Sequence, residues 1–546
     1  MNLAPTLRVQ TWLRHSAERA ATLTDIKVWL LAAVTGVLTT YGVIGFILAI
    51  EWITEWAYGE PAEMLAEGAR ALAPWRAFVV PVAGGVIVGF LLWWSRRSGW
   101  ISDFRCQGVA EVIEARARPP GAITMRGGLI NTAVCAIALG SGSSAGREGP
   151  AVLLGGAFSV LVSKRFGLSA RDSRTLLGCA AAAAVSAAFN APIAGVLFAL
   201  EVVLSNYALS IFAPIALSSI IATLIARYHL GDLHRFVIPE YGGAAPLDLA
   251  LGGSLGLIAG AVSILFLVAA AWGRSASRWS VSRLRLPQPL LPVIAGVGMG
   301  AVGIVLPEAL GYGYQATTEA LAGNYTLGLL TILLLAKVFT TVLCLSCRFG
   351  TGVFSGGIFL GAMSGAAFGI VMNMIFGPFI ASPTFFAMIG MGAVSGAIIG
   401  APISTTLIVF ELTGDYTMTA ALMIAVGIAT VLTQIFFGTS WFHFQLNQRG
   451  YDLSEGPQGV ILQTIRVRDV MRPVPDSAAP LEDDTPRLSA NQTLGDALAE
   501  MSKLKLDAMP VTTAKDQNKL LGTITQIRAL RTYNKALVDS HIEHHR

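Results

Sequence analysis

The residues best suited to chemistry in this chain form the pentapeptide Gly146-Arg147-Glu148-Gly149-Pro150, which lies between a Gly/Ser-rich segment and an apolar run. Pro150 suits the first turn of a helix, where its missing N–H costs nothing. The first N–H groups of a helix are unpaired and lie at its positive dipole end, and the two glycines leave room for an anion to approach them. The pentapeptide therefore predicts an anion-facing helix start that also carries the carboxylate of Glu148. Taken alone it is more typical of an ordinary capped helix, so the surrounding sequence has to decide.

The elements that must position this pentapeptide are membrane-spanning helices. The 546 residues are 54% hydrophobic and 13% charged, with a mean hydropathy of +0.63, whereas a soluble domain has roughly 25% charged residues. Many of the apolar runs are long enough to cross roughly 30 Å of hydrocarbon. The runs cover residues 28–50, 76–94, 123–139, 174–189, 209–226, 248–271, 289–306, 326–346, 384–410 and 417–437. The net charge of +5 then follows membrane topology rather than nucleic-acid binding, for which we find no motif.

Residues 1–25 form a polar, basic leader that contains Arg8, Arg14 and Arg19. A cleavable signal peptide would carry its apolar region nearer the N-terminus, so none is expected. The cationic residues predict a cytoplasmic N-terminus by the positive-inside rule. We therefore expect a multi-pass protein of the cell inner (plasma) membrane, with both termini in the cytoplasm.

The apolar part contains an internal repeat at an offset of 210 residues. Asn190-Ala191-Pro192-Ile193 leads to Glu201, and Gly400-Ala401-Pro402-Ile403 leads to Glu411. Because Glu411 repeats Glu201 in the other half, we expect Glu201 to serve structure rather than proton transfer. An ionisable group at membrane depth is nevertheless a functional candidate.

The same offset relates the pentapeptide to a second Gly-rich segment, since Gly146 corresponds to Gly356. The chain has 58 glycines, many of which interrupt the apolar runs and predict broken helices. Such breaks are tolerated at membrane depth only where protein buries them or where they line an aqueous path. Duplicated halves with broken helices are typical of transporters that hold an anion at half-helix N-termini.

These segments, together with Gly357-Ile358-Phe359 and Phe410-Glu411-Leu412-Thr413, resemble the motifs of the CLC family of chloride channels and chloride/proton exchangers. The resemblance covers about residues 25–450. It implies an all-α polytopic membrane domain at 26–450, made of two inverted repeats (about 26–230 and 247–450) of tilted, partly spanning helices. It also implies a homodimer in the lipid bilayer with a separate pathway for chloride or another small anion in each subunit, and no cofactor.

The resemblance also assigns roles to individual residues. The backbone N–H groups of Arg147, Glu148 and Gly149, and those of Ile358 and Phe359, would line the anion site. Such donors attract a dehydrated halide without the full positive charge that would trap it. Glu148 would be the gate, because its carboxylate can occupy an anion site when ionised and leave it when protonated.

Three positions depart from the family pattern. In the loop 106–110, Gln107 replaces a serine whose hydroxyl faces the central anion in many relatives, while the backbone N–H groups of Gln107 and Gly108 remain candidate donors. Phe442 stands where the family has a tyrosine and lacks its hydroxyl; we expect it to line the inner mouth, the alternative being a packing aromatic. Val202 stands where exchangers often carry a proton-transferring glutamate. Valine carries no proton, which favours channel-like flow, with exchange through another proton route as the alternative.

Beyond residue 450 the composition changes. Residues 451–487 are polar and rich in proline and predict a linker. Residues 465–546 are similar to a single CBS domain, with a helix capped by Thr493 and short strands at 509–511 and 520–525. Arg528 stands where nucleotide-binding CBS domains often have an aspartate, so nucleotide binding is doubtful and a structural or dimer-supporting role is expected.

Other classes of function fit less well. We find neither a nucleophile paired with a base nor a HExxH-type helix, so we expect no enzyme. Cys344 and Cys347 are expected to pack within an apolar helix, and the histidines at 541, 544 and 545 to be merely polar, so no metal site is predicted. Another inverted-repeat anion transporter remains an alternative, although it would not predict Glu148 and Phe359 together.

Overall fold

The computed structural model describes most of the chain. The described ranges are 4–101, 103–117, 123–231, 246–450, 462, 465–474, 485–513 and 520–545, and the side chains of 4–25 and 536–545 are not described. The structure divides into two compact units: Met1–Ile113, Pro120–Ser205 and Ile211–Trp441 form the first, and Glu114–Pro119, Asn206–Ser210 and Phe442–Arg546 form the second. The linker predicted at 451–487 lies largely outside the described residues.

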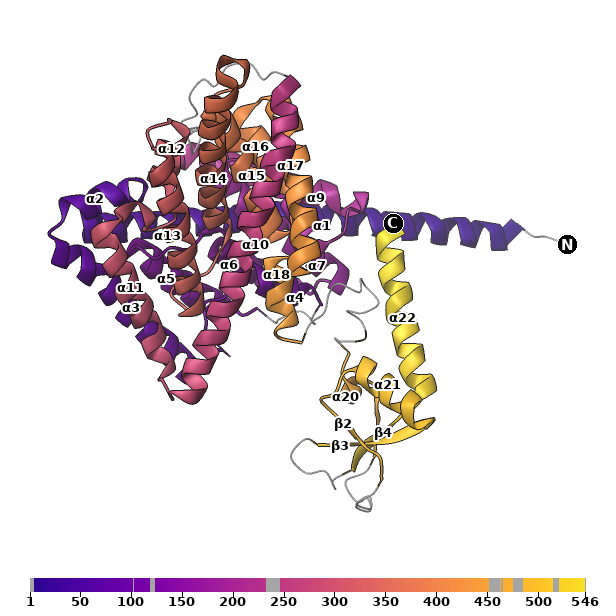
Figure 1. The fold of residues 1–546 in the computed structure, drawn as a ribbon. Coiled ribbons are helices and arrows are strands. Elements are labelled where there is room, and N and C mark those ends of the chain that lie inside the picture. The colour runs from indigo at the N-terminus through magenta and orange to yellow at the C-terminus, as the bar shows by residue number, and fades with distance from the viewer. Residues whose placement is uncertain are drawn as a thin grey trace. The chain divides into compact units, whose positions relative to one another are not determined.

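The first unit is built from helices (Figure 1). They are α1 (Ala4–Tyr58), α2 (Leu65–Ala71), α3 (Pro74–Arg97), α4 (Val109–Ala117), α5 (Met125–Gly140), α6 (Glu148–Arg165), α7 (Ala170–Phe189), α8 (Pro192–Phe198), α9 (Leu209–Leu230), α10 (Pro246–Arg283), α11 (Leu291–Val305), α12 (Tyr314–Leu321), α13 (Leu327–Ser346), α14 (Phe354–Phe376), α15 (Pro383–Ile399), α16 (Pro402–Thr413) and α17 (Tyr416–Phe437). Within the described residues, eight helical stretches are long and apolar enough to cross a membrane. The predicted multi-pass helical fold is confirmed.

Several helices are too short to cross a bilayer, as the glycine content predicted. Apolar helices of 10–17 residues include α5, α15 and α16. α7 ends at Asn190 and α15 at Gly400, both in the left-handed conformation (φ 57° and 72°), and α8 and α16 then begin with Pro192 and Pro402. A left-handed cap followed by a proline stops one helix and starts the next.

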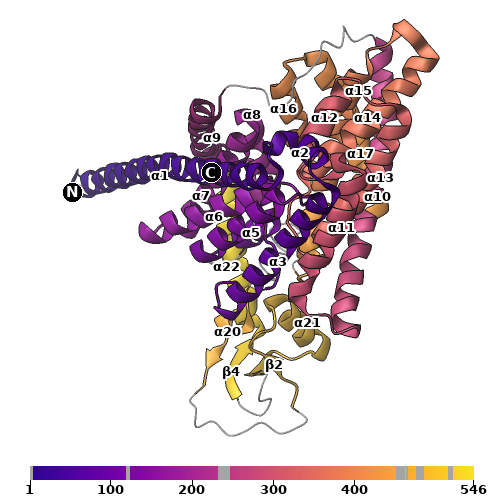
Figure 2. The same cartoon turned by 90° about the vertical axis from the view of Figure 1, so that its left-hand side faces the viewer.

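The helices of each half pack largely with one another. α6 runs along α7 and contacts α1 and α5, while α14 runs along α15 and α10 along α17. Figures 1 and 2 both show α10, α13, α14, α15 and α17 gathered in one layer of this unit. The contact between α3 and α11 joins the early and late helices.

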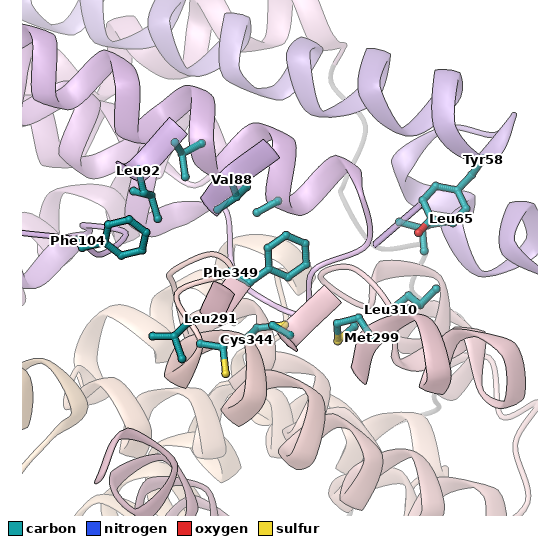
Figure 3. Close-up of a cluster of buried hydrophobic side chains, with 14 of the residues drawn as sticks. Tyr58, Leu65, Val88, Leu92, Phe104, Leu291, Met299, Leu310, Cys344 and Phe349 are labelled. Carbon is teal, nitrogen blue, oxygen red and sulfur yellow. The ribbon is translucent and has the colours of Figure 1, made fainter. Parts of the chain in front are cut away.

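A buried apolar cluster fixes the loop that leads into α14. Phe349 is fully buried and packs among side chains of both halves, including Val88 and Leu92 of α3 and Leu291 of α11 (Figure 3). Phe349 directly precedes Gly350 in the chain. Residues 350–353, which matter below, are therefore attached to the core at their N-terminal side.

The internal repeat appears as a reciprocal exchange of helix caps. The Glu411 carboxylate accepts hydrogen bonds from the N–H groups of Ile193 (2.9 Å) and Ala194 (2.8 Å) at the start of α8. The Glu201 carboxylate accepts from those of Ile403 (3.1 Å) and Ser404 (2.8 Å) at the start of α16. The glutamate of each half thus accepts from the otherwise unpaired N–H groups at a helix start of the other half. This exchange explains why the two glutamates recur at the same offset.

The second unit contains a small mixed sheet with helices. After α18 (Trp441–Asn447), its elements are α20 (Val467–Val470), β1 (Arg472–Pro473), β2 (Leu488–Ser489), α21 (Leu494–Leu504), β3 (Ala508–Thr512), β4 (Leu520–Thr525) and α22 (Gln526–His545). The strand order is β1-β4-β3-β2, with β2 parallel to β3 and the other pairs antiparallel. Thr493 caps α21 by accepting from the N–H of Asp496 at 3.0 Å, so the predicted cap and both predicted strands are confirmed.

Candidate anion site

α6 begins at Glu148, inside the protein. Arg147 is its N-cap, Pro150 lies in its first turn as predicted, and the side chain of Glu148 is only 5% exposed. Arg147 is also buried, with its guanidinium 5.1 Å from the centre of the Tyr312 ring. A helix N-terminus at this depth presents unpaired N–H groups away from bulk water, where they attract an anion most strongly.

The carboxylate of Glu148 reaches the start of the other Gly-rich helix. Oε1 accepts from the N–H of Ser355 at 3.0 Å and Oε2 from the Ser355 hydroxyl at 2.9 Å. Ser355 is the second residue of α14, where the N–H has no helical partner. Glu148 therefore binds at the helix terminus as an anion would.

The start of α14 differs from the prediction. The helix begins at Phe354 rather than near Gly356, and the N–H of Gly357 already donates to Val353 at 2.8 Å. The N–H groups of Ile358 and Phe359 therefore follow the first turn, and the donors without helical partners belong to the first three residues, 354–356. The starts of α6 and α14 are 206 residues apart (148 to 354), so the 210-residue offset fails here although it holds for α8 and α16.

The sequence signal for the true start of α14 was the segment Gly350-Thr351-Gly352, which lies just before the helix. Gly352 has φ +95°, and a Cβ on it would lie 2.5 Å from the carbonyl oxygen of Gly146. The N–H of Gly146 donates to the carbonyl of Gly352 at 3.0 Å. The segments that lead into the two helices are thus bonded backbone to backbone, and only glycine fits at 352.

Three segments meet at this point, and we call them the glycine junction: Gln107-Gly108, Glu148-Gly149 and Thr351-Gly352. A Cβ on Gly108 would lie 3.5 Å from the Cα of Gly149 and 3.1 Å from Oγ1 of Thr351. A Cβ on Gly149 would lie 3.5 Å from the Cα of Gly352. The structure therefore brings Gly108 close to Gly149 and so to the neighbouring Glu148.

The backbone donors of the loop before α4 are occupied. The N–H of Gln107 donates to Oδ1 of Asn131 (2.7 Å), and Nδ2 of Asn131 donates back to the Gln107 carbonyl (2.9 Å). The N–H of Gly108 donates to Oε2 of Glu111 at 2.7 Å. Sequence reasoning missed Asn131 and Glu111, which take both candidate donors of this loop.

On the Arg147 side of the junction lies a cavity of about 20 Å³. It is lined by Arg147, Phe189, Tyr312, Tyr314, Thr317, Ser355 and Ile358. A cavity of that size holds a single water-sized species. Because Ser355 also holds the Glu148 carboxylate, the cavity lies beside that carboxylate, and Ile358 is among its lining residues.

A buried cation lies close to α14. Lys337 is 1% exposed, and its Nζ donates to the carbonyls of Ala309 (3.2 Å) and Gly311 (2.7 Å). Nζ also lies 4.8 Å from the centre of the Phe359 ring. Phe359 is therefore a packing residue that faces a cation, and the apolar run around Lys337 offered no sequence signal for this arrangement.

The remaining predicted positions fall outside the junction as the structure describes it. Val202 is 6% exposed in the π-helical turn Ala199–Leu204, beside Glu201, whose carboxylate is occupied at α16. Phe442 is 6% exposed and belongs to the second unit, so its place at the inner mouth stays a prediction.

The sequence of the first unit matches the family model described as voltage gated chloride channel over residues 88–434. The chain belongs to the CLC family. Among curated relatives of this CLC protein, a putative chloride channel protein ClcB-like from Ralstonia nicotianae is 30% identical over 399 residues, covering 72% of this chain and 91% of the relative. The H(+)/Cl(−) exchange transporter ClcA from Cronobacter sakazakii is 30% identical over 458 residues, covering 80% and 93%.

Solved structures show the same fold. A slow cyanobacterial Cl−/H+ antiporter superposes with a TM-score of 0.68 at 22% identity, covering 77% of this chain and 97% of that one. A eukaryotic CLC transporter gives a TM-score of 0.65 at 17% identity, covering 92% and 98%. The predicted family and its fold of two inverted repeats are confirmed.

Proposed function

We propose that the protein carries chloride or a similar small anion across the membrane through a pathway that Glu148 gates. The observation that carries this proposal is the pair of hydrogen bonds from Ser355 to the Glu148 carboxylate, since they place a tethered negative charge at an anion-binding helix start. A free anion and this carboxylate then compete for the same donors. Protonation of Glu148 removes its charge and favours the free anion.

The donors suit conduction because they are weak and numerous. The first turn of α6 offers the N–H groups of 147–149, and that of α14 offers those of 354–356. Dipole ends attract an ion without the strong binding that a lysine would impose. We assign the anion contacts of the second half to this turn rather than to the N–H groups of Ile358 and Phe359.

We further propose channel-like or weakly proton-coupled flow. Val202 cannot carry a proton, and the neighbouring Glu201 is held by two N–H groups of α16. Exchange by another proton route is the second candidate, favoured by the similarity to an H(+)/Cl(−) exchange transporter. The family expectations of a homodimer, an inner-membrane location and cytoplasmic termini belong to the same proposal, as does a CBS-like role of residues 465–546 without nucleotide binding.

Simultaneous recording of chloride and protons in liposomes tests the mode of transport. With purified protein and an outward chloride gradient, we expect chloride efflux with little or no uphill proton uptake. Val202→Glu places a carboxylate at the position where exchangers often carry a proton-transferring glutamate. Val203→Glu is its matched control, because it introduces a carboxylate at another buried valine of the same turn. Steady uphill proton movement by the wild-type protein would establish exchange and contradict the channel-like mode.

A further inference from the structure

We propose that Thr351 is an anion ligand, its hydroxyl donating to the permeating ion at the glycine junction. The inference rests on the proposed function, because it adds a ligand to the same pathway. Three observations support it. The N–H groups of Gln107 and Gly108 are occupied, the Thr351 side chain lies against Gly108, and the Thr351 hydroxyl has no protein partner in the described part of the chain.

The N–H groups of Gln107 and Gly108, in the loop before α4, already have partners. Asn131, 2% exposed on α5, bonds both the N–H and the carbonyl of Gln107, and Glu111 holds the N–H of Gly108. Each of these donors would have to break a short hydrogen bond before it could bind an ion. An anion at the junction is therefore left with the N–H groups at the starts of α6 and α14, and a side-chain hydroxyl facing the loop before α4 adds a donor on that side.

The Thr351 side chain faces this loop. Its Oγ1 lies 3.1 Å from the position that a Cβ on Gly108 would take, and its Cγ2 lies 3.5 Å from that of a Cβ on Gly149. The hydroxyl thus lies against Gly108 and the methyl group against both Gly108 and Gly149. The side chain is partly buried and close to the first turn of α6.

The Thr351 hydroxyl is a donor without a protein partner in the described part of the chain. Hydroxyls around it are occupied: Ser143 donates to the Phe349 carbonyl, Ser144 pairs with Thr341 at 2.9 Å, and Ser355 donates to Glu148. A rotatable O–H can turn toward an ion, and it adds no charge that would trap the ion. Thr351 thus supplies a hydroxyl in a pathway where Gln107 replaces the serine that the resemblance led us to expect.

Two pairs of proteins that differ only by a hydroxyl test this assignment. Wild type and Thr351→Val have side chains of similar shape, and Thr351→Ser and Thr351→Ala both lack the methyl group. The measurement is the chloride concentration that half-saturates efflux from liposomes. We expect the Val and Ala variants to require roughly three- to tenfold more chloride than their hydroxyl-bearing partners, because a hydrogen bond to a charged group is lost.

Selectivity provides a readout that packing alone would not move. Loss of a hydroxyl should penalise chloride more than the weakly hydrated thiocyanate, so the chloride-to-thiocyanate flux ratio should fall in both hydroxyl-free variants. Thr40→Val is the control, since Thr40 is buried in α1 with its hydroxyl bonded to the Gly36 carbonyl (2.7 Å). It should leave half-saturation and selectivity unchanged.

Each outcome bears on the proposal. Equal half-saturation within both pairs would overturn it and leave Thr351 a packing residue. If the Val variant fails to reconstitute, the Ser and Ala pair decides in the same way. Absence of chloride flux in the wild-type protein would overturn the proposed function itself, whereas normal flux with unchanged variants would overturn only the role of Thr351.

Discussion

Glu148→Ala is expected to give chloride flux that is faster at neutral pH than wild-type flux and nearly independent of pH. The substitution removes the carboxylate that accepts both hydrogen bonds from Ser355, so the donors of α14 become free for an ion. A wild-type gate held by two bonds to a charged group should reduce neutral-pH flux by about tenfold or more, which corresponds to about 1.4 kcal/mol. The measurement is chloride efflux from liposomes at neutral and at acidic pH.

The sign of the pH effect is part of this prediction. Acidification neutralises the wild-type carboxylate, so wild-type flux should rise as the pH falls and approach that of the Ala variant. Ser355→Ala keeps the N–H bond and loses the hydroxyl bond, so it should lie between the two. Glu63→Ala, at an exposed glutamate, is the control. A Glu148→Ala variant with the pH dependence of wild type would contradict the gating role.

Loss of either exchanged cap is expected to destabilise the first unit. Glu411→Ala would leave the N–H groups of Ile193 and Ala194 unpaired, and Glu201→Ala those of Ile403 and Ser404. An orphaned donor that is fully buried costs about 1–3 kcal/mol. Because Ile193 and Ile403 are exposed, we expect a smaller loss, roughly 1–2 kcal/mol per variant.

Unfolding of the purified protein in detergent measures this loss, with Glu63→Ala as the control. The matching Gln variants keep one acceptor oxygen and should lose less stability than the Ala variants. Glu201 also accepts from the Ser404 hydroxyl, so Glu201→Ala should cost at least as much stability as Glu411→Ala. If both Ala variants unfold like the control, the exchange of caps contributes no stability and our account of the repeat is wrong.

The parts of the fold that could be predicted depend on local chemistry. Pro192 and Pro402 mark helix starts because proline is favoured in the first turn of a helix, and the matched motifs around them reveal the 210-residue repeat. Glu148 follows a Gly-rich segment and precedes Pro150, so the start of α6 could also be predicted. The apolar runs indicated the spanning helices, because the thickness of the hydrocarbon layer dictates the length of such helices.

The start of α14 could not be predicted by extending that repeat. Its first turn has no proline, and the four-residue change of offset arises between the starts of α14 and α16, which are 48 residues apart (354 to 402), whereas those of α6 and α8 are 44 apart (148 to 192). Several glycines in this region satisfy the same pattern. The N–H groups of Ile358 and Phe359, which the resemblance assigned to the anion site, follow this first turn, and their role stays a prediction.

The side chains that complete the site depend on tertiary contacts. Asn131 bonds Gln107 across 24 residues of sequence, and Thr351 approaches Gly108 from the other half of the protein. Neither residue belongs to a motif that predicts such a contact. Only the folded chain shows that the loop's backbone donors are occupied.

Competition between Glu148 and the permeating ion is the central claim, and calorimetric titration of purified protein with chloride tests it most directly. Wild type and Glu148→Ala are compared at neutral and acidic pH, with Glu63→Ala as the control. We predict tighter chloride binding by Glu148→Ala at neutral pH, by roughly three- to tenfold, and wild-type binding that strengthens as the pH falls. Equal affinities of the two proteins at both pH values would show that the Glu148 carboxylate and the anion do not share a site.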